Sequence, residues 1–126
     1  MEIKCKISPT ILVVDDEDSL SFSLISILKM EGYEAVSANS GKKAIELIKN
    51  NKFDAAFFDI RLPDMKGVEL LREAKLINNK LIVIMMTAYA YNDLIKTTIQ
   101  EGAFRCLRKP FEVIEMLDLV RNLFKE

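Results

Sequence analysis

Three short apolar runs in this chain each end abruptly at a polar side chain. Residues 11–14 lead into Asp15 and Asp16, residues 55–58 lead into Asp59, and residues 81–86 lead into Thr87. Their lengths and apolar character are typical of strands buried on both faces in the middle of a parallel sheet. Because ligands of open α/β sheets bind beyond the carboxyl ends of the strands, these polar side chains should gather at one edge of one sheet.

Segments with helical periodicity separate such runs along the chain. Strands are expected at 10–14, 33–37, 53–59, 81–86 and 104–107. Helices are expected around the apolar positions of 20–30, 44–48, 68–74, 94–99 and 113–124, the first with its N-terminal turn in 15–19 and the second ending near 50–51. Strict alternation of this kind implies a parallel sheet with right-handed crossovers and helices on both faces. The sequence therefore predicts an α/β fold, a single doubly wound (βα)5 domain at 10–126, after a loose polar lead-in at 1–9.

The composition narrows the classes of protein and of partner. The chain has 126 residues, the size of one domain, and its 50% hydrophobic content is enough for a core. A formal net charge of −1 gives no basic surplus for nucleic acid or an acidic membrane, so neither is expected as a direct partner. The apolar runs are too short to span a bilayer, and the N-terminus lacks a signal peptide's apolar stretch. We therefore expect a cytoplasmic protein.

The chain contains no histidine and only two cysteines, Cys5 and Cys106. Without a signal peptide, these thiols are expected to stay reduced. The lack of histidine excludes the usual zinc sites and the Ser-His and Cys-His nucleophiles. Any chemistry on this chain must use carboxylates, hydroxyls and lysines.

Asp15 and Asp16 follow one predicted strand, and Asp59 follows another. Carboxylates that converge without compensation repel one another and raise each other's pKa. A divalent cation would remove this conflict, and oxygen-only ligands favour a hard ion, Mg²⁺ before Ca²⁺. Capping of the next helix is the alternative role for the Asp pair, and it explains one acid better than the full set.

Lys109 and Thr87 complete the polar set at the predicted sheet edge. A lysine there offers a compact positive charge to an anion, although most lysines are simply solvated at the surface. Thr87 offers a hydroxyl donor, or alternatively a cap for the next helix. A carboxylate nucleophile, a metal, a cation and a hydroxyl donor together suit phosphoryl transfer to a carboxylate.

The chain resembles the receiver domain of two-component response regulators over almost its whole length, from about Thr10. Each matching piece is weak alone, but their order and spacing are highly specific. The pieces are VVDDE (13–17), FDIRLPDMKG (58–67), MTAY (86–89), GA (102–103) and KPF (109–111). The resemblance implies a flavodoxin-like strand order, 2-1-3-4-5.

The resemblance also implies roles at the acidic site. Asp59 would accept a phosphoryl group from a sensor histidine kinase or a phosphotransfer protein, in a Mg²⁺-dependent reaction. Asp16, Asp59 and the main-chain carbonyl of Arg61 would bind Mg²⁺ directly, while Asp15 would help through water. Such a chain is a phosphoacceptor switch that assists its own phosphorylation and dephosphorylation, and not a turnover enzyme for a separate substrate.

Phosphorylation would then change a partner-binding face. Lys109 would pair with the phosphoryl group, and Thr87 would move toward it and shift the face of the fourth helix, fifth strand and fifth helix. That face would bind an unknown downstream protein or output domain, and it could support a phosphorylation-linked homodimer. The resemblance also implies a cis Lys109–Pro110 bond. Candidate exposed residues on this face are Tyr91, Lys96, Gln100 and Arg108.

Two features depart from, or add to, the family pattern. The family usually carries Tyr or Phe three residues before the lysine, where this chain has Cys106, so coupling from Thr87 to the output face is expected to differ. Arg61 and Tyr89 lie two residues after Asp59 and Thr87. These large side chains either slow loss of the phosphoryl group or have no kinetic effect.

Two other functions compete with this interpretation. An aspartyl-phosphate phosphatase would carry a second acid two residues after the nucleophile, where this chain has Arg61. A flavodoxin-like FMN carrier would need a phosphate-binding loop after the first strand, and the acids at 15–18 would repel a phosphate.

Overall fold

Five parallel strands form a single sheet in the order β2-β1-β3-β4-β5, as the resemblance implied. The computed structural model describes residues 8–88 and 92–124, and within the second range it describes side chains from residue 95 onward. The strands are β1 (Thr10–Val14), β2 (Glu34–Ala38), β3 (Ala55–Asp59), β4 (Ile82–Thr87) and β5 (Arg105–Arg108). The helices are α1 (Asp18–Met30), α2 (Gly41–Asn50), α3 (Gly67–Ile77), α4 (Asn92–Gln100) and α5 (Val113–Leu123). This alternation confirms the predicted doubly wound α/β fold.

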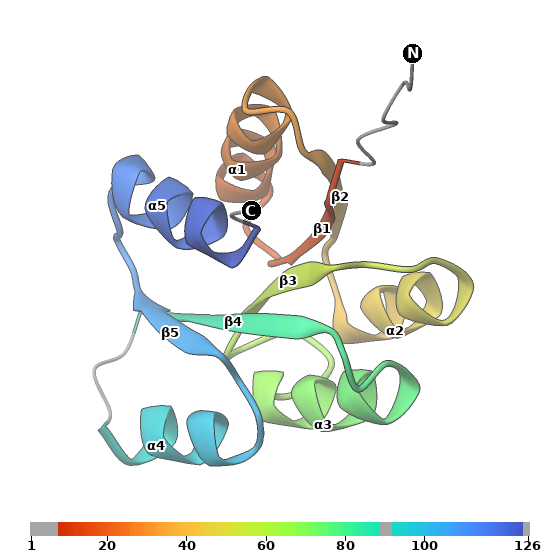
Figure 1. Cartoon of the computed structure of the whole chain (residues 1–126). Coiled ribbons are helices and arrows are strands. Elements are labelled where there is room, and N and C mark those ends of the chain that lie inside the picture. Colours follow the sequence, from red (N-terminus) through yellow and green to blue (C-terminus); the bar gives the residue numbers. More distant parts are fainter. Residues whose placement is uncertain (1–7, 89–91, 125–126) are drawn as a thin grey trace.

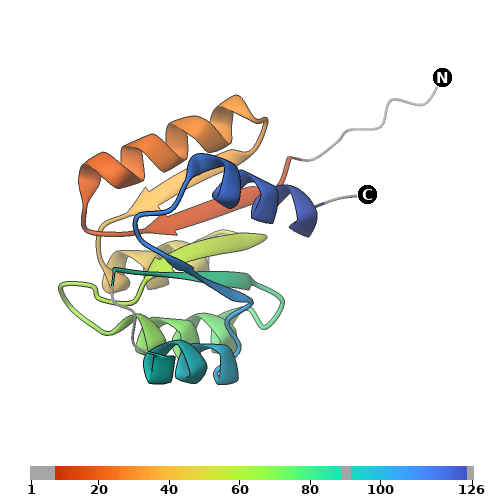
Figure 2. The same cartoon turned by 90° about the vertical axis from the view of Figure 1, so that its left-hand side faces the viewer.

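Helices cover both faces of the sheet. Figure 1 shows α1 and α5 on one face and α2, α3 and α4 on the other, and Figure 2 shows the same layers from the side. Successive side chains of a strand point to opposite faces, so each strand supplies two cores. The core under α2 and α3 includes Leu12, Val14, Ala56, Phe58, Val83 and Met85. The core under α1 and α5 includes Ile11, Val13, Ala55, Phe57, Ile84 and Met86.

The register of the ladders brings the strand ends together at one edge. Val14 lies opposite Phe58, so that Asp15 and Asp59 are the next residues along β1 and β3. Asp59 in turn lies opposite Met86, one residue before Thr87. The Lys109 N–H donates to the Thr87 carbonyl at 2.6 Å, which carries the pairing of β4 and β5 past Arg108. The edge predicted from the sequence therefore exists.

Element boundaries differ slightly from the sequence-based expectation. β4 includes Thr87, because its pairing with β5 continues to that residue. β3 begins at Ala55 and not at 53, and the carboxylate of Asp54, just before it, accepts a hydrogen bond from the Thr10 N–H at 2.8 Å. α2 begins at Gly41, within the segment expected to be a turn, because Ser40 caps it and accepts a hydrogen bond from the Lys43 N–H.

Further predictions concern the N-terminal residues, the two tyrosines after β4, the peptide bond before Pro110 and the absence of membrane-spanning segments. Most of the predicted lead-in, and both Tyr89 and Tyr91, lie outside the described residues. The Lys109–Pro110 bond is cis, as expected. In the parts of the chain that the structure describes, none of the helices is both long and apolar enough to cross a membrane.

Candidate functional site

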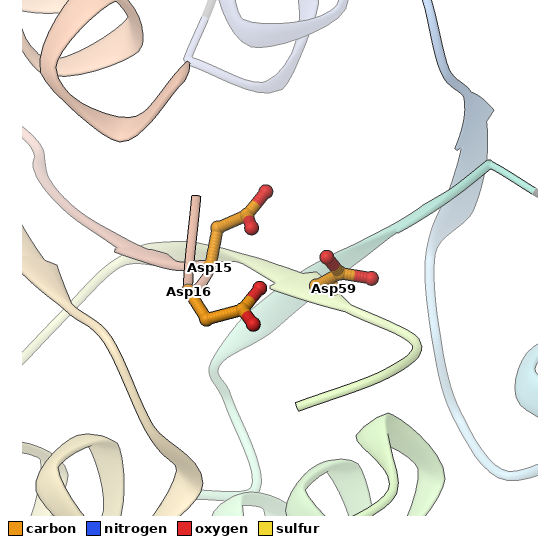
Figure 3. A group of neighbouring side chains, drawn as sticks. All are labelled: Asp15, Asp16 and Asp59. Carbon is orange, nitrogen blue, oxygen red and sulfur yellow. The ribbon is translucent and has the colours of Figure 1, made fainter. Parts of the chain in front are cut away.

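Three carboxylates meet beyond the ends of β1 and β3. One carboxylate oxygen each from Asp15, Asp16 and Asp59 lies within 4.8 Å of the other two (Figure 3). Asp15 is buried, Asp59 is half-buried and Asp16 is exposed. The group therefore spans the boundary between the core and solvent, and its convergence confirms the arrangement predicted from the strand ends.

Lys109 reaches two of these carboxylates from the end of β5. Its Nζ donates to Oδ2 of Asp15 at 2.6 Å and to Oδ2 of Asp59 at 3.0 Å. The side chain of Asp15 has no exposed surface, and those of Lys109 and Asp59 are each 14% exposed, so solvent screens these ion pairs weakly. Lys109 is therefore held in the site, and the alternative of a solvated surface lysine is wrong.

The second oxygens of Asp15 and Asp59 accept hydrogen bonds from backbone groups. Oδ1 of Asp15 accepts a hydrogen bond from the Glu17 N–H at 2.9 Å, and Oδ1 of Asp59 accepts one from the Arg61 N–H at 3.0 Å. Among the described residues, no hydrogen bond or ion pair engages the carboxylate of Asp16. Asp16 is consequently the acid most available to an incoming ligand.

Burial and ion pairing both change the pKa values of groups in the site. Burial raises the pKa of Asp59 above its ordinary value of 3.8, against the opposing effects of the Arg61 N–H and Lys109, and Asp15 adds to the rise. Burial acts to lower the pKa of Lys109, but its bonds to Asp15 and Asp59 outweigh burial and raise it. The two rises therefore have different causes: burial raises the pKa of Asp59, and the two carboxylate partners raise that of Lys109.

The donor set fits a divalent cation. Three carboxylates and one ammonium leave two negative charges uncompensated within the group. All the candidate ligands are oxygens, which is the donor type that Mg²⁺ and Ca²⁺ prefer. The partial exposure of Asp16 and Asp59 leaves room for the water molecules that Mg²⁺ retains. The residues present therefore match the ion expected from the sequence.

The loop after β3 is folded as a tight hairpin that presents Arg61. The Leu62 N–H donates to the Met65 carbonyl at 3.2 Å, and the Gly67 N–H donates to the Ile60 carbonyl at 2.6 Å. Arg61 and Lys66 lie opposite each other in this hairpin. The two backbone hydrogen bonds of the hairpin are made by the residues on either side of this pair. Arg61 is exposed, and its N–H holds the Asp59 carboxylate.

Gly67 allows α3 to pack directly on the backbone of the acidic residue. A Cβ added at Gly67 would collide with the Asp59 carbonyl oxygen and would lie 2.7 Å from the Cα of Ile60. Real Cβ atoms do not approach backbone this closely. The glycine of the 58–67 segment therefore sets the position of Asp59 relative to α3.

Thr87 and Cys106 lie on neighbouring strands near the same edge. Thr87 is 1% exposed at the end of β4, and its carbonyl accepts the hydrogen bond from Lys109. Cys106 is partly buried on β5 and packs against the core under α2 and α3. Burial raises the pKa of its thiol, against the charge of Arg108, so the thiol stays protonated.

Because Tyr89 is outside the described residues, the hypothesis about phosphoryl lifetime stays a prediction.

Sequence reasoning missed one residue that the structure connects to the site. Asp64, at the tip of the hairpin after β3, accepts hydrogen bonds from the backbone N–H groups of Gly41 and Lys42 at 2.8 and 2.9 Å. The sequence shows a Pro-Asp turn and, separately, the start of a helix. Nothing in the local pattern predicts that they touch.

A family model and the similar curated proteins identify the same family for this chain. The family model described as "Response regulator receiver domain" matches residues 11–121. The curated protein "Sporulation initiation phosphotransferase F" from Bacillus subtilis is 33% identical over 112 residues, which is 89% of this chain and 90% of that protein. Three other curated relatives, named as regulatory or transcriptional-regulator proteins, are longer, and the chain spans 24%, 23% and 24% of their lengths.

Solved structures agree with this assignment. A response regulator receiver domain protein (CheY-like) from Methanospirillum hungatei is 34% identical with a TM-score of 0.89, covering 92% of this chain and 93% of that one. The beryllofluoride-activated NtrC4 receiver domain dimer is also 34% identical, with a TM-score of 0.87, covering 92% of this chain and 96% of that one.

Proposed function

Because this chain belongs to the response regulator receiver domain family of two-component signalling, we propose that Asp59 is its phosphoryl-accepting residue. Accepting a phosphoryl group is the general role of this domain. The observation that carries the proposal is the bridging position of Lys109, which holds Asp59 and Asp15 together at the sheet edge. Asp59 is half-buried, so its carboxylate can still be reached from solvent.

The transfer itself is a displacement at phosphorus. An oxygen of the Asp59 carboxylate attacks the phosphorus of a phosphohistidine, the P–N bond breaks, and the imidazole leaves with its electron pair. The new P–O bond makes an acyl phosphate on Asp59. Lys109 would stabilise the negative charge on the phosphoryl oxygens, because its ammonium already lies at hydrogen-bond distance from Asp59.

The metal expected at this site is Mg²⁺. Asp16, Asp59 and the main-chain carbonyl of Arg61 would hold it, with Asp15 acting through water. When bound, Mg²⁺ neutralises charge on the transferring phosphoryl group. Asp15 suits an indirect role, because its side chain has no exposed surface, whereas that of Asp59 is 14% exposed.

Thr87 and the face of α4, β5 and α5 are the proposed switch. The hydroxyl of Thr87 would hydrogen-bond the phosphoryl group and draw the following loop with it. Phosphorylation adds charge and hydrogen-bond acceptors at one point, which can favour one of two arrangements of that loop. The exposed side chains of Lys96, Gln100 and Arg108 on this face are then available to a downstream protein or output domain.

Partners follow from the family and from the surface beside the site. Receiver domains interact with histidine kinases or phosphotransfer proteins, and either would be the donor here. A cleft of about 320 Å³ lies beside Lys109 and is a candidate contact surface for the donor protein. It is lined by Glu17, Leu20, Ala88, Lys109, Pro110 and Phe111. Phosphorylation-linked dimerisation and a cytoplasmic location are further parts of this proposal.

Intact mass spectrometry tests the proposal. Wild-type protein and Asp59→Asn are each incubated with acetyl phosphate, with and without Mg²⁺. The proposal expects the mass of one phosphoryl group on wild type only, and only with Mg²⁺. Sustained release of phosphate over many turnovers would support the phosphatase alternative instead, and flavin absorbance in the purified protein would support the FMN carrier.

A further inference from the structure

The hairpin between β3 and α3 is fixed at both ends. At its base, the Arg61 N–H binds the Asp59 carboxylate at 3.0 Å, and the Gly67 N–H binds the Ile60 carbonyl. At its tip, Asp64 binds the first turn of α2, which follows a different strand. Residues 60–67 therefore lie between the acidic site and a neighbouring helix and contact both.

The contact at the tip is bidentate and supported by packing. Oδ1 of Asp64 accepts from the Gly41 N–H at 2.8 Å, and Oδ2 accepts from the Lys42 N–H at 2.9 Å. Helix N-termini leave such N–H groups without partners inside the helix, and a carboxylate satisfies them strongly. The side chain of Met65 covers Gly41 so closely that a Cβ there would lie 2.5 Å from its sulfur. We call this pair of hydrogen bonds with the Met65 contact the Asp64 clamp.

The clamp closes a ring of contacts around the acidic site. The Asp15 N–H donates to the carbonyl of Ala38, the last residue of β2, at 3.1 Å. Only two residues separate Ala38 from Gly41, where the clamp begins. From Asp64 the hairpin leads back to Arg61 and Asp59, and Lys109 joins Asp59 to Asp15. The position of the Arg61 backbone is therefore set from β1 and α2 as well as from β3.

We propose that Asp64 is a positioning residue for the candidate metal site. Its clamp on α2 fixes the hairpin so that the main-chain carbonyl of Arg61 can bind Mg²⁺. This inference rests on the proposed function. Asp64 lies at the tip of the hairpin and is not one of the three acids that converge at the site, so it acts on the site through the loop. The backbone hydrogen bonds from Gly41 and Lys42 lower the pKa of Asp64, so the clamp is ionised at neutral pH.

Thermodynamic reciprocity gives the proposal a second consequence. If the clamp favours Mg²⁺ binding, then Mg²⁺ must strengthen the clamp by the same factor. The N–H groups of Gly41 and Lys42 should therefore exchange with solvent more slowly when Mg²⁺ is bound. Because Mg²⁺ binding also stabilises the whole fold, this slowing should exceed that of the Thr10 N–H, which Asp54 holds in a similar way at the other end of the sheet.

The test is an NMR titration of the folded protein with Mg²⁺ alone, which needs no phosphoryl donor. Asp64→Ala is expected to weaken Mg²⁺ binding about tenfold, as is usual when an outer partner of a metal ligand is lost. Asp64→Asn should lose less, because its single amide oxygen can still accept one of the two bonds. It also serves as the second variant if Asp64→Ala does not fold.

Asp54→Ala is the matched control. Asp54 also accepts a hydrogen bond from the backbone of another element, the Thr10 N–H at 2.8 Å, but it precedes β3 and so lies at the opposite edge of the sheet. Its loss should leave Mg²⁺ affinity unchanged. Repeating the titrations at about 1 M monovalent salt, where screening is nearly complete, separates a geometric effect from the loss of a nearby charge.

The outcomes are distinct. Weaker Mg²⁺ binding in Asp64→Ala that persists at high salt supports the proposal, together with a slowing of Gly41 and Lys42 amide exchange by Mg²⁺ in wild type that exceeds the slowing at Thr10. Wild-type affinity in Asp64→Ala, or a loss that disappears at high salt, overturns it and leaves the proposed function intact. Wild-type protein that binds no Mg²⁺ overturns the metal part of the proposed function, and this inference with it.

Discussion

Lys109 and Asp59 are 50 positions apart in the sequence, and a 3.0 Å hydrogen bond joins the lysine Nζ to Oδ2 of the acid. The same Nζ lies 2.6 Å from Oδ2 of Asp15. A single ammonium thus spaces the two acids and offsets part of their repulsion. The predictions below follow from this arrangement and from the contacts that hold it.

Lys109→Ala should slow phosphorylation of Asp59 by acetyl phosphate about 10²-fold, a usual effect of losing one charge-stabilising donor. The substitution also leaves Asp15 and Asp59 without their shared cation, so the Mg²⁺-free protein should lose stability. The rate is followed by intact mass over time. Lys49→Ala, at an exposed lysine in the last turn of α2, is the control and should keep the wild-type rate.

Asp16→Ala should abolish the stabilisation of the protein by Mg²⁺. A ligand present at 100 times its dissociation constant stabilises the folded state by about 2.7 kcal/mol, so wild type should melt at a higher temperature in Mg²⁺. Without Mg²⁺ the exposed Asp16 carries little stability, and the variant should melt close to wild type or slightly above it. Thermal melts with and without Mg²⁺ measure both effects, and an equal response of the two proteins to Mg²⁺ would contradict the ligand role.

Asp59→Asn should stabilise the Mg²⁺-free protein at neutral pH by about 1 kcal/mol, within the usual range for a stabilising change. The pKa of Asp59 is raised on folding, so its contribution to stability is present below its unfolded pKa and is lost as pH rises through the folded pKa. At neutral pH the ionised carboxylate therefore opposes folding. The gain measured by urea unfolding should shrink as pH falls toward 4, and a gain that is independent of pH would contradict this cause.

Gly67→Ala should destabilise the protein by about 2 kcal/mol, as overpacking against backbone usually does. Its Cβ would collide with the Asp59 carbonyl oxygen, which cannot move without moving the acid itself. Gly41→Ala is the comparison, because the Cβ there meets only the flexible side chain of Met65. Urea unfolding should rank Gly67→Ala as clearly the more costly change.

Cys106→Tyr should change how phosphorylation affects α4. A thiol is much smaller than the aromatic ring usual at this position and cannot report the switch in the same way. NMR of wild type and variant, each before and after phosphorylation, compares the shifts of α4 amides. Identical shifts on activation in the two proteins would show that the cysteine is unimportant for the switch.

Most of the fold was predictable because its signals are local. Apolar runs such as 55–58 and the helical periodicity between them depend on neighbouring residues, and strict alternation of the two restricts the topology. The boundaries were less predictable because they depend on partners in space. β4 extends to Thr87 because β5 pairs with it, and α2 begins early because Ser40 caps it.

The acids of the site were predictable for the same reason, since Asp15, Asp16 and Asp59 each follow a recognisable strand. Lys109 was ambiguous, because only its contacts distinguish it from a surface lysine. The Asp64 clamp could not be predicted, because it joins residues 23 positions apart with no shared pattern. The close approach at Gly67 also needs coordinates, since a glycine before a helix has several ordinary explanations.

The most direct test of the account is to locate the phosphoryl group chemically. Wild-type protein is phosphorylated with acetyl phosphate and Mg²⁺ and then reduced with borohydride, which converts an aspartyl phosphate to homoserine. Peptide mapping by mass spectrometry then identifies the position. If Asp59 is the acceptor, homoserine is expected at residue 59 alone. Homoserine at residue 15 or 16, or no homoserine in a protein that has gained a phosphoryl group, would contradict it.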